Sequence, residues 1–418
     1  LSTALLLICL GCQQTVTNRG TLTTAQPEQA GFSSERLARI DTTLNRWVTD
    51  GWMNGAVAFI AHDGKIVYHK AFGYNNPATN EKLQTDHLFR IASQTKAITS
   101  VAVMMLYEEG KFLLDDPLAK YIPAFGNATV LNTFNATDTS YTTVPAKRAV
   151  TVRDLLTHTS GIGYAQIGSA EANALYAKAN ITAGIYDTRN TLADAIDRLG
   201  KLPLMHQPGE RWTYGLNTDV LGRLVEVLSG QTLETFFTER IFKPLGMNDT
   251  YFNVPEEKAS RLVNFFTEDS AGLHITPNVW NTDMDYPLHK KSYFSGGAGL
   301  TSTVYDYAIF LQMLLNNGTY NGVRILSRNT VRLMTMNQIG DLALGDDKFG
   351  LGFLVVSEKG SAQFPHRQGT YSWGGAFSTS YWVDPEEKLV VLLYRQMWGS
   401  HGELGNLYKV LVYQALNE

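Results

Sequence analysis

Ser93 and Lys96 stand three residues apart in the segment RIASQTKAITS, and their side chains have the chemistry to transfer an acyl group together. The residues that follow, 97–107, are almost wholly apolar, which is typical of a buried helix. Residues three apart lie on the same face of a helix, so the hydroxyl and the amine can touch. A buried lysine needs a paired charge or a lowered pKa, and in the second case it can act as a base. The segment therefore predicts a nucleophilic serine at a helix start, where backbone N–H groups favour a developing oxyanion.

The same two residues also fit a structural role. Ser93 can cap the N-terminus of the helix, and Lys96 can lay its stem on apolar surface while its ammonium reaches water. A single S-x-x-K pattern also arises by chance in a chain of 418 residues, so the spacing alone does not choose between the two roles. The choice depends on partners elsewhere in the chain.

Histidine is the usual base of a serine hydrolase, commonly with the serine in a G-x-S-x-G turn. No G-x-S-x-G segment occurs in this sequence. The nine histidines are scattered and form no H-x-H or H-E-x-x-H pair; they are His62, His69, His87, His158, His206, His274, His289, His366 and His401. We therefore expect no metal, no cofactor and no histidine base, and we place His158 in the loop that borders the pocket.

Tyr214 is the other candidate base. It lies in QPGERWTYGLNTDVLG, after a Pro-Gly turn and directly before a helix that Asn217 or Thr218 opens. A tyrosine at such a junction is commonly half-buried packing, and that interpretation stays open for this segment alone. A lysine ammonium close to a tyrosine, however, favours the phenolate, because an opposite charge lowers a tyrosine's pKa.

The segment WGGAFSTSYWVDP is a candidate for the oxyanion donors. We predict that Trp373, Gly374, Gly375 and Ala376 lie at the start of a strand. Two glycines let a backbone approach a ligand closely, so the N–H of Ala376 can face that of Ser93 and form a two-donor oxyanion hole. A bulge at a strand entry would give the same pattern.

The two ends of the chain carry the strand patterns that must position these groups. Residues 33–48 predict an amphipathic helix, and residues 56–74 predict a hairpin about Asp63-Gly64. From residue 293 the strand patterns return, led by GLGFLVV and by two strands about an Asp-Pro-Glu-Glu turn. A helix at about 402–416 closes the chain.

The middle of the chain is different. Residues 111–290 are rich in loops and show no clear paired strands; they predict helices at 192–199, 218–229 and 232–241. We therefore expect an α+β fold, in which residues 23–110 and 291–418 form an antiparallel sheet flanked by the terminal helices. Residues 111–290 form a mainly helical inserted domain, and enzyme pockets favour the seam between such parts.

Composition restricts the partners. A net charge of −4, with 44% apolar and 18% charged residues, describes an ordinary globular protein without a basic surface, so we expect no nucleic acid partner. Residues 1–22 are a leader and linker, because LSTALLLICLGC looks like a secretory signal that ends in a bacterial lipoprotein processing site. We expect an exported protein, periplasmic or anchored to a membrane by a lipid on Cys12. Cys9 is the other cysteine, so the folded part has neither a disulfide nor a thiolate site.

Six separated blocks, in this order, resemble the serine β-lactamase-like superfamily over about residues 30–415. They are SQTK, VTVRDLLTHTSGIG, QPGERWTYGLNTDVLG, IFKPLGMNDTYF, FSGGAGLTSTVYDY and WGGAFSTSYWVDPEEKLVV. The branch that they resemble most is the class C β-lactamase-related carboxylesterases, known as family VIII. The resemblance implies a β-lactamase-like fold.

By this resemblance, Ser93 is the acylated nucleophile, Lys96 its activating partner and Tyr214 the general base. Trp373-Gly374-Gly375 stands in place of the Lys-Thr-Gly motif of the β-lactamases and would contact the substrate. The N–H groups of Ser93 and Ala376 would form the oxyanion hole.

Two departures from the β-lactamase pattern bear on the substrate. The Tyr-x-Asn motif is replaced by Tyr214-Gly215-Leu216, with an asparagine only at position 217. The Lys-Thr-Gly site has lost its cation and its hydroxyl to Trp373 and Gly374. Both losses remove polar contacts to a β-lactam but leave acyl transfer possible.

We therefore expect a serine carboxylesterase that hydrolyses short-chain esters through an acyl-enzyme on Ser93, with a weak β-lactamase side activity. Its partner is a small ester, and neither the acyl chain length nor the oligomeric state follows from the sequence. Three alternatives stay open: a class C-like β-lactamase, an acyltransferase, and a non-catalytic penicillin-binding or cell-wall-sensing lipoprotein.

Overall fold

The computed structural model of this chain describes residues 20–182, 184–185, 190–270, 272–279, 282–399 and 401–417. Cys9 and Cys12 of the expected leader lie in residues 1–19, outside the described residues, so export and lipidation stay predictions. Within the described ranges, no helix combines the length and the apolar character that a membrane crossing needs.

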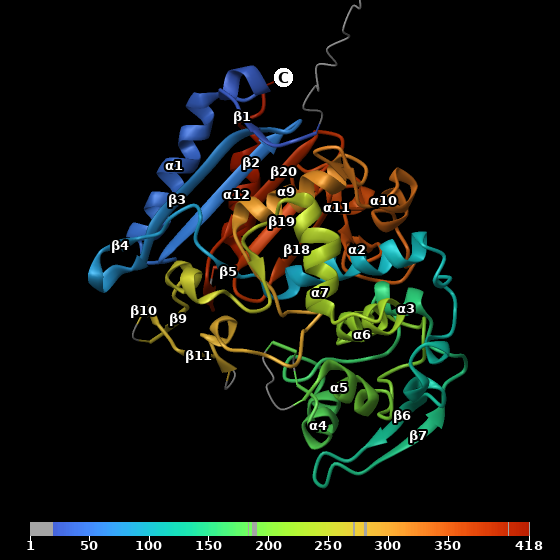
Figure 1. Cartoon of the computed structure of the whole chain (residues 1–418). Helices are drawn as coiled ribbons and strands as arrows, with labels where there is room; N and C mark the ends of the chain where they lie inside the picture. Colours follow the sequence, from blue (N-terminus) through green and yellow to red (C-terminus); the bar gives the residue numbers. More distant parts are fainter. Residues whose placement is uncertain are drawn as a thin grey trace, which may run out of the picture.

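A nine-stranded sheet, drawn from both ends of the chain, forms the centre of the fold (Figure 1). The strands follow the order β1-β3-β2-β20-β19-β18-β17-β16, with β4 beside β3, and only β1 pairs in parallel with its neighbour. Their bounds are β1 Thr23–Thr24, β2 Gly55–His62, β3 Lys65–Asn76, β4 Glu81–Lys82, β16 Lys348–Phe349, β17 Leu354–Val355, β18 Tyr371–Gly375, β19 Thr379–Asp384 and β20 Leu389–Tyr394. The predicted α+β fold with an antiparallel sheet is confirmed.

Helices cover both faces of this sheet, and the sequence of β2 shows why. Ala58 and Ile60 pack in one apolar cluster with α1 (Ser34–Thr49) and α12 (Glu403–Tyr413). Val57 and Phe59 pack in another with α2 (Thr95–Glu108) and α9 (Val304–Leu315). Successive side chains of a strand point to opposite faces, so a strand that is apolar throughout needs cover on both. The terminal helices therefore share one face, as predicted, and α2 lies on the other.

Local signals set several boundaries. α1 begins after Ser33, whose hydroxyl accepts a hydrogen bond of 3.2 Å from the N–H of Arg36. The β2–β3 hairpin turns at Asp63 and Gly64, which both have a positive φ, as a tight hairpin turn requires. α2 ends at Glu108, two residues before Gly110, whose φ of 71° is the left-handed conformation that commonly follows a helix end.

The region between the two ends of the sheet is mainly helical. Its helices are α3 Val152–Leu156, α4 Ala170–Lys178, α5 Leu192–Leu199, α6 Asn217–Ser229, α7 Leu233–Phe237 and α8 Lys243–Leu245, with a π turn at Thr238–Phe242 between the last two. The three predicted helices of this region are present. One apolar core joins it to the sheet, because α6 residues such as Leu221 pack in the same cluster as Val101 of α2. The domain boundaries at 110 and 290 stay a prediction.

The expectation that residues 111–290 hold no paired strands was wrong. A hairpin of β6 (Thr129–Phe134) and β7 (Tyr141–Pro145) projects at the lower right of Figure 1. Every residue of β7 is exposed, so the strand has no buried face and no apolar alternation for a pattern to detect. It is defined by its antiparallel pairing with β6, which the Thr133 and Thr142 hydroxyls reinforce with a hydrogen bond of 2.6 Å.

Helix α9 was also not predicted. All its residues from Tyr307 to Leu314 are buried, so it is apolar on every side and lacks the periodicity that distinguishes a helix from a strand. Its start is nevertheless fixed locally, because the Thr303 hydroxyl accepts a hydrogen bond of 3.1 Å from the N–H of Asp306.

Short elements complete the described fold. They are β5 Phe89–Arg90, β8 Thr250–Tyr251, β9 Phe266–Asp269, β10 Gly272–Ile275, β11 Asn278–Val279, β12 Thr282–Asp283, β13 Thr301–Ser302, β14 Thr319–Tyr320, β15 Val323–Arg324, β21 Met397–Trp398, α10 Arg328–Met334 and α11 Glu358–Ser361. β13 pairs with both β5 and β8, and so ties the segment before Ser93 to the middle of the chain.

Candidate active site

Ser93 lies in a 3₁₀ turn, Ala92–Gln94, that leads directly into α2. Neither this turn nor α2 has a side-chain cap at its N-terminus, so the alternative that Ser93 is a helix cap was wrong. Ala92 has a φ of 42°, a left-handed conformation that is strained for a residue with a β-carbon. Such strain persists only where the surrounding packing holds it, and it is concentrated at functional sites.

The structure brings Ser93, Lys96 and Tyr214 together. The Tyr214 hydroxyl donates a hydrogen bond of 2.6 Å to Ser93 Oγ, and Lys96 Nζ donates one of 3.4 Å to the same atom. Lys96 Nζ also donates to the carbonyl oxygen of Gly297 at 2.8 Å and lies 4.7 Å from the centre of the Tyr214 ring. A lysine three residues away and a tyrosine 121 residues away in the sequence therefore converge on the Ser93 hydroxyl.

This geometry offers Ser93 a proton acceptor and a cation. Tyr214 can take the serine proton as a phenolate, and the nearby ammonium favours negative charge on either oxygen. Only 3% of Lys96 is exposed, and a charge shielded from water acts more strongly on its neighbours. The arrangement can therefore activate a serine without histidine.

The residues on either side of Tyr214 are held by the loop after α3. Thr213 N–H donates to the carbonyl oxygen of His158 at 2.8 Å, and Leu216 N–H donates to that of Gly163 at 3.0 Å. A β-carbon on Gly215 would lie 2.0 Å from a carbonyl oxygen of the same loop, so only glycine fits there. These contacts fix the position of the tyrosine above the nucleophile.

A chain of buried polar side chains runs behind Tyr214. Ile162 N–H donates to Ser160 Oγ at 3.0 Å, and the Ser160 hydroxyl donates to Asn217 Oδ1 at 2.5 Å. The amide nitrogen of Asn217 is then left to donate to His158 Nδ1, which lies 2.9 Å away. His158 Nδ1 is therefore an acceptor, and Asn217 contacts the histidine instead of Ser93.

His158 is a neutral packing residue in this site. It is buried, and its ring centre lies 5.2 Å from that of Tyr214. Burial, together with the charge of Lys96, holds the pKa of His158 well below its usual range. The structure thus places His158 against Tyr214, in a loop whose Gly163 lines the adjoining pocket, and its protonated form is excluded at neutral pH.

The lowered pKa of His158 predicts a loss of stability in acid. Below about pH 6.5 the unfolded chain gains a proton on this histidine that the folded chain does not bind, so the free energy of unfolding falls as the pH falls. We expect His158→Ala to lose less stability than the wild type between about pH 7 and pH 5, measured by urea unfolding. The exposed His274→Ala is the control and should keep the wild-type pH dependence.

The same variant tests the base. We expect kcat/KM of His158→Ala to change less than about tenfold, through packing, with the acid limb of the pH profile unmoved. A fall to the level of a Ser93 variant, with the acid limb lost, would instead make His158 the base.

Aromatic rings line the space beside the nucleophile. The ring centre of Trp373 lies 5.6 Å from that of Tyr214 and 5.5 Å from that of Phe349. Tyr164 adds a ring 5.3 Å from Tyr214, and Trp212 adds one 5.7 Å from Phe349. Indole and phenyl surfaces bury neutral, apolar groups well and offer an anion little to replace its water.

The predicted start of a strand at Trp373 was wrong, because Trp373, Gly374 and Gly375 end strand β18. The strand begins earlier, at Tyr371, and its first residues pair with β17. That partner is only two residues long, so the pairing leaves too short a pattern to detect in the sequence.

Ala376 lies in the turn between β18 and β19, next to the segment that carries Ser93. A β-carbon on Gly375 would lie 2.4 Å from the carbonyl oxygen of Ile91, so glycine permits this approach. Ala376 also packs against the apolar cluster that contains Ala92. The role of its N–H as an oxyanion donor stays a prediction.

A pocket of about 460 Å³ adjoins Tyr214. It lies between β6, α4 and the loop before Tyr214, and it is lined by Leu131, Asn132, Phe134, Gly163, Gly168, Ser169, Glu171, Ala172, Met205, His206, Arg211, Thr213 and Tyr214. Tyr214 is the only one of the three converging residues in this lining. The pocket offers space for part of a substrate at the edge of the site.

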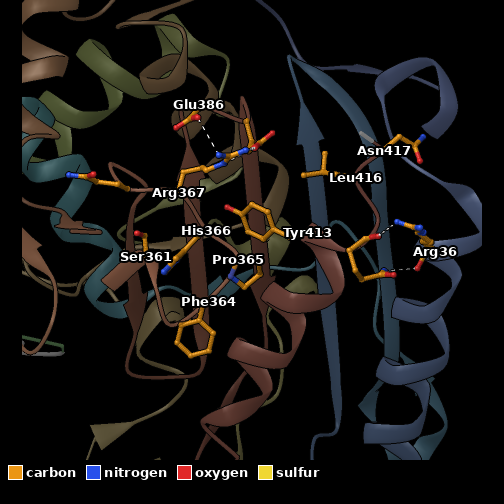
Figure 2. Close-up of a pocket in the computed structure, with 13 residues that line it drawn as sticks. Arg36, Ser361, Phe364, Pro365, His366, Arg367, Glu386, Tyr413, Leu416 and Asn417 are labelled. Atoms are coloured by element: carbon orange, nitrogen blue, oxygen red, sulfur yellow. Dashed lines mark hydrogen bonds and ion pairs between the residues drawn. The ribbon is translucent and has the colours of Figure 1, made fainter. Parts of the chain in front are cut away.

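A larger pocket, of about 970 Å³, lies elsewhere (Figure 2). It is formed by Arg36 of α1, the loop around His366 and the C-terminal Leu416 and Asn417. None of the residues that converge on Ser93 lines it. Of its two arginines, Arg367 already pairs with Glu387 at 2.7 Å, so size alone does not make this pocket the catalytic site.

Asp219 and Gly297 were not predicted from the sequence as residues of this site. Asp219 is buried in the first turns of α6, and Gly297 accepts the hydrogen bond of Lys96 through its carbonyl oxygen. An acidic residue five positions after Tyr214, in the first turn of the predicted helix, was the available signal. Across the described ranges, no group of three His, Cys, Asp or Glu side chains has an arrangement that could hold a metal ion.

The chain matches one protein-family model and several known proteins over most of its length. The beta-lactamase family model matches residues 37–412. An uncharacterized protein of Mycobacterium tuberculosis is 34% identical over 365 residues, which cover 82% of this chain and 85% of that protein. A putative D-alanyl-D-alanine carboxypeptidase of Escherichia coli is 29% identical over 414 residues, or 93% of this chain and 88% of the relative.

Two further relatives are named as esterase or hydrolase. Esterase EstB of Burkholderia gladioli is 29% identical over 395 residues, which cover 89% of this chain and 94% of EstB. The solved structure of EstCE1, described as a hydrolase with promiscuous acyltransferase activity, matches with a TM-score of 0.76 and 25% identity. That match covers 91% of this chain and 99% of EstCE1.

Proposed function

We propose that this chain hydrolyses short-chain neutral carboxylic esters. It belongs to the beta-lactamase family and is a serine hydrolase. The reaction would pass through an acyl-enzyme on Ser93. The single observation that carries the proposal is the convergence of Lys96 and Tyr214 on Ser93 Oγ beside the uncharged ring of Trp373.

Acylation begins when Tyr214, as a phenolate, takes the proton of the Ser93 hydroxyl. Ser93 Oγ then forms a bond to the ester carbonyl carbon, and the carbonyl oxygen becomes an oxyanion that backbone N–H groups of Ser93 and Ala376 stabilise. The C–O bond to the alcohol breaks as the alkoxide leaves and takes the proton from Tyr214. The ammonium of Lys96 stabilises the negative charge throughout.

Deacylation repeats these steps with water. Tyr214 takes a proton from a water molecule, whose oxygen attacks the acyl carbon. Ser93 Oγ leaves and recovers the proton from Tyr214, and the carboxylic acid is released. The enzyme returns to its starting state without a cofactor.

The Trp373 side chain favours the binding of neutral substrates over that of β-lactams, which carry a carboxylate. Its indole offers one N–H and no charge, so a carboxylate placed against it would lose water without gaining a partner. A neutral acyl or alkyl group gains from the same surface. The pocket of about 460 Å³ beside Tyr214 gives room for such a group.

We expect kcat/KM for p-nitrophenyl butyrate to exceed that for a chromogenic cephalosporin by about a hundredfold or more, because two units of about 1.4 kcal/mol separate the substrates. Trp373→Lys should narrow this gap from both sides, since it weakens apolar packing and supplies a cation for the carboxylate. Both substrates are assayed on the same preparation.

Trp52→Lys is the control for the substitution itself. Trp52 is stacked on His401 away from this site, so its replacement should leave the substrate ratio unchanged. If the wild type instead hydrolyses cephalosporins as efficiently as butyrate esters, it is a β-lactamase, and the esterase proposal fails. Acylation without turnover would indicate a penicillin-binding sensor, and an added alcohol that diverts the acyl group would indicate an acyltransferase.

A further inference from the structure

Asp219 is a buried carboxylate that the mechanism above does not use. Only 1% of the residue is exposed. Its Oδ1 accepts hydrogen bonds from Ser295 Oγ at 2.7 Å and from the Tyr293 hydroxyl at 3.2 Å. Its Oδ2 is buried and accepts no hydrogen bond of normal geometry from the described residues.

Gly297 lies between this carboxylate and Lys96. A β-carbon on Gly297 would lie 2.5 Å from Asp219 Oδ2 and 3.4 Å from Lys96 Nζ. Both charges therefore border the small space that the glycine leaves open. The same residue accepts the 2.8 Å hydrogen bond of Lys96, while its N–H donates to Ser295 Oγ at 3.2 Å.

A buried carboxylate with one unpaired oxygen is unfavourable unless a cation is near. Burial raises the pKa of Asp219, and the hydrogen bond from Ser295 and the charge of Lys96 oppose that rise. A buried ammonium has the same need for an opposite charge. The Lys96 ammonium therefore supplies the positive charge that the Asp219 carboxylate needs, and the carboxylate supplies the negative charge that the ammonium needs.

We infer that Asp219 is the counter-charge of Lys96 and a positioning residue of the catalytic site. It holds the ammonium between Ser93 and the Tyr214 ring through the Gly297 backbone. It contacts neither the substrate nor the reacting atoms. Its kinetic consequence rests on the proposed function, but its effect on stability does not.

Other titratable groups face the same pair. Tyr164 and His158 approach Lys96 along with Tyr214; the ammonium lies 5.3 Å from the centre of the Tyr164 ring, and its charge acts on His158. Tyr293 faces Asp219. Asp219 is the carboxylate among these groups, whereas the negative charge of Tyr214 in the proposed mechanism moves to and from the reacting groups, so Asp219 is assigned as the fixed counter-charge of the ammonium.

A stability cycle tests the pairing without any substrate. Lys96→Met leaves the carboxylate buried without its cation, and Asp219→Asn leaves the ammonium buried without its anion, so each should lower Tm. The double variant carries neither charge, so its Tm should lie well above the value expected if the two losses added, and above that of Lys96→Met alone. Tm is measured at about pH 7, where a free carboxyl is ionised.

Asp306→Asn is the matched control for the cycle. Asp306 is also a buried aspartate near a helix start, and burial raises its pKa to about 6. It accepts hydrogen bonds from Asp249 N–H and Thr250, and its pairing does not involve Lys96. Its effect on Tm should therefore add to that of Lys96→Met. Additive losses for Asp219 as well would overturn the inference.

The pH profile of Asp219→Asn gives the second test. The acid limb of kcat/KM reports the loss of a proton from the Lys96–Tyr214 unit. The negative charge of Asp219 favours keeping that proton. Removing this charge in Asp219→Asn should therefore move the acid limb to lower pH by about one unit. We expect kcat to fall about tenfold, because the ammonium is less well held. Asp306→Asn should keep the wild-type profile.

The outcomes separate this inference from the proposed function. If ester turnover is absent but the Tm cycle is non-additive, the esterase proposal fails and the pairing stands. If turnover depends on Ser93 but both the cycle and the acid limb are unchanged, the pairing fails. If Asp219→Asn does not fold, Ser295→Ala replaces it. This variant removes a hydrogen bond that stabilises the Asp219 carboxylate but keeps the carboxyl group, so the acid limb should shift in the same direction. An unmoved limb there also refutes the inference.

Discussion

Ser93→Ala is expected to lower kcat for ester hydrolysis by roughly a thousandfold or more, because no acyl-enzyme can form without the hydroxyl. The fold should survive, since Ser93 caps neither the 3₁₀ turn nor α2 and loses only its bonds to Tyr214 and Lys96. Turnover of p-nitrophenyl butyrate and Tm measure the two effects.

Ser100→Ala is the control for Ser93. Ser100 is a buried serine of the same helix, two turns further on, and its loss should leave turnover near the wild-type rate. A phosphonate ester that labels serine nucleophiles should add its mass to the wild type and to Ser100→Ala, but not to Ser93→Ala. Retention of more than a few per cent of the rate in protein free of wild type would exclude Ser93 as the nucleophile.

Lys96→Ala and Tyr214→Phe should each reduce kcat nearly as much as Ser93→Ala does. Tyr214→Phe keeps the ring contacts with Trp373 and His158 but removes the oxygen that accepts the proton. Lys96→Ala removes the cation that lies beside Ser93 Oγ and over the Tyr214 ring. Either loss leaves Ser93 without activation, and kcat on p-nitrophenyl butyrate measures it.

The double variant distinguishes one proton-transfer unit from two separate contributions. Groups that act as a unit are strongly non-additive, so Lys96→Ala with Tyr214→Phe should lose little more than either single variant. Additive losses in log kcat would mean that Lys96 and Tyr214 act independently. His158→Ala is the reference, because it alters the packing of Tyr214 without removing either group.

The relatives agree with this picture at the level of the family. EstB is named an esterase and EstCE1 a hydrolase, and the Escherichia coli relative is named a putative carboxypeptidase. These names leave the substrate of this chain to experiment, and the ratio between neutral esters and cephalosporins is the measurement that decides it.

The fold was predictable where a segment carries a local signal, such as one apolar helix face or a tight turn. α1 and the β2–β3 hairpin follow their patterns closely, because amphipathic helices and tight turns leave local signals. Prediction failed for β6 and β7, which are largely exposed, and for α9, which is buried all round. In these elements the apolar residues show neither the helical nor the strand periodicity from which an element could be predicted.

For the site, the sequence alone indicated the candidate groups. The S-x-x-K spacing puts a lysine on the same helical face as Ser93, and the sequence holds neither a G-x-S-x-G segment nor a paired-histidine motif. Only the tertiary structure decided that Tyr214, more than a hundred residues away, donates to Ser93 Oγ at 2.6 Å. It also decided that Gly297 brings the buried charge of Asp219 next to Lys96. The physical reason is that helical spacing is local, whereas these contacts depend on the packing of α2 against α6 and the loop before α9, which no short pattern encodes.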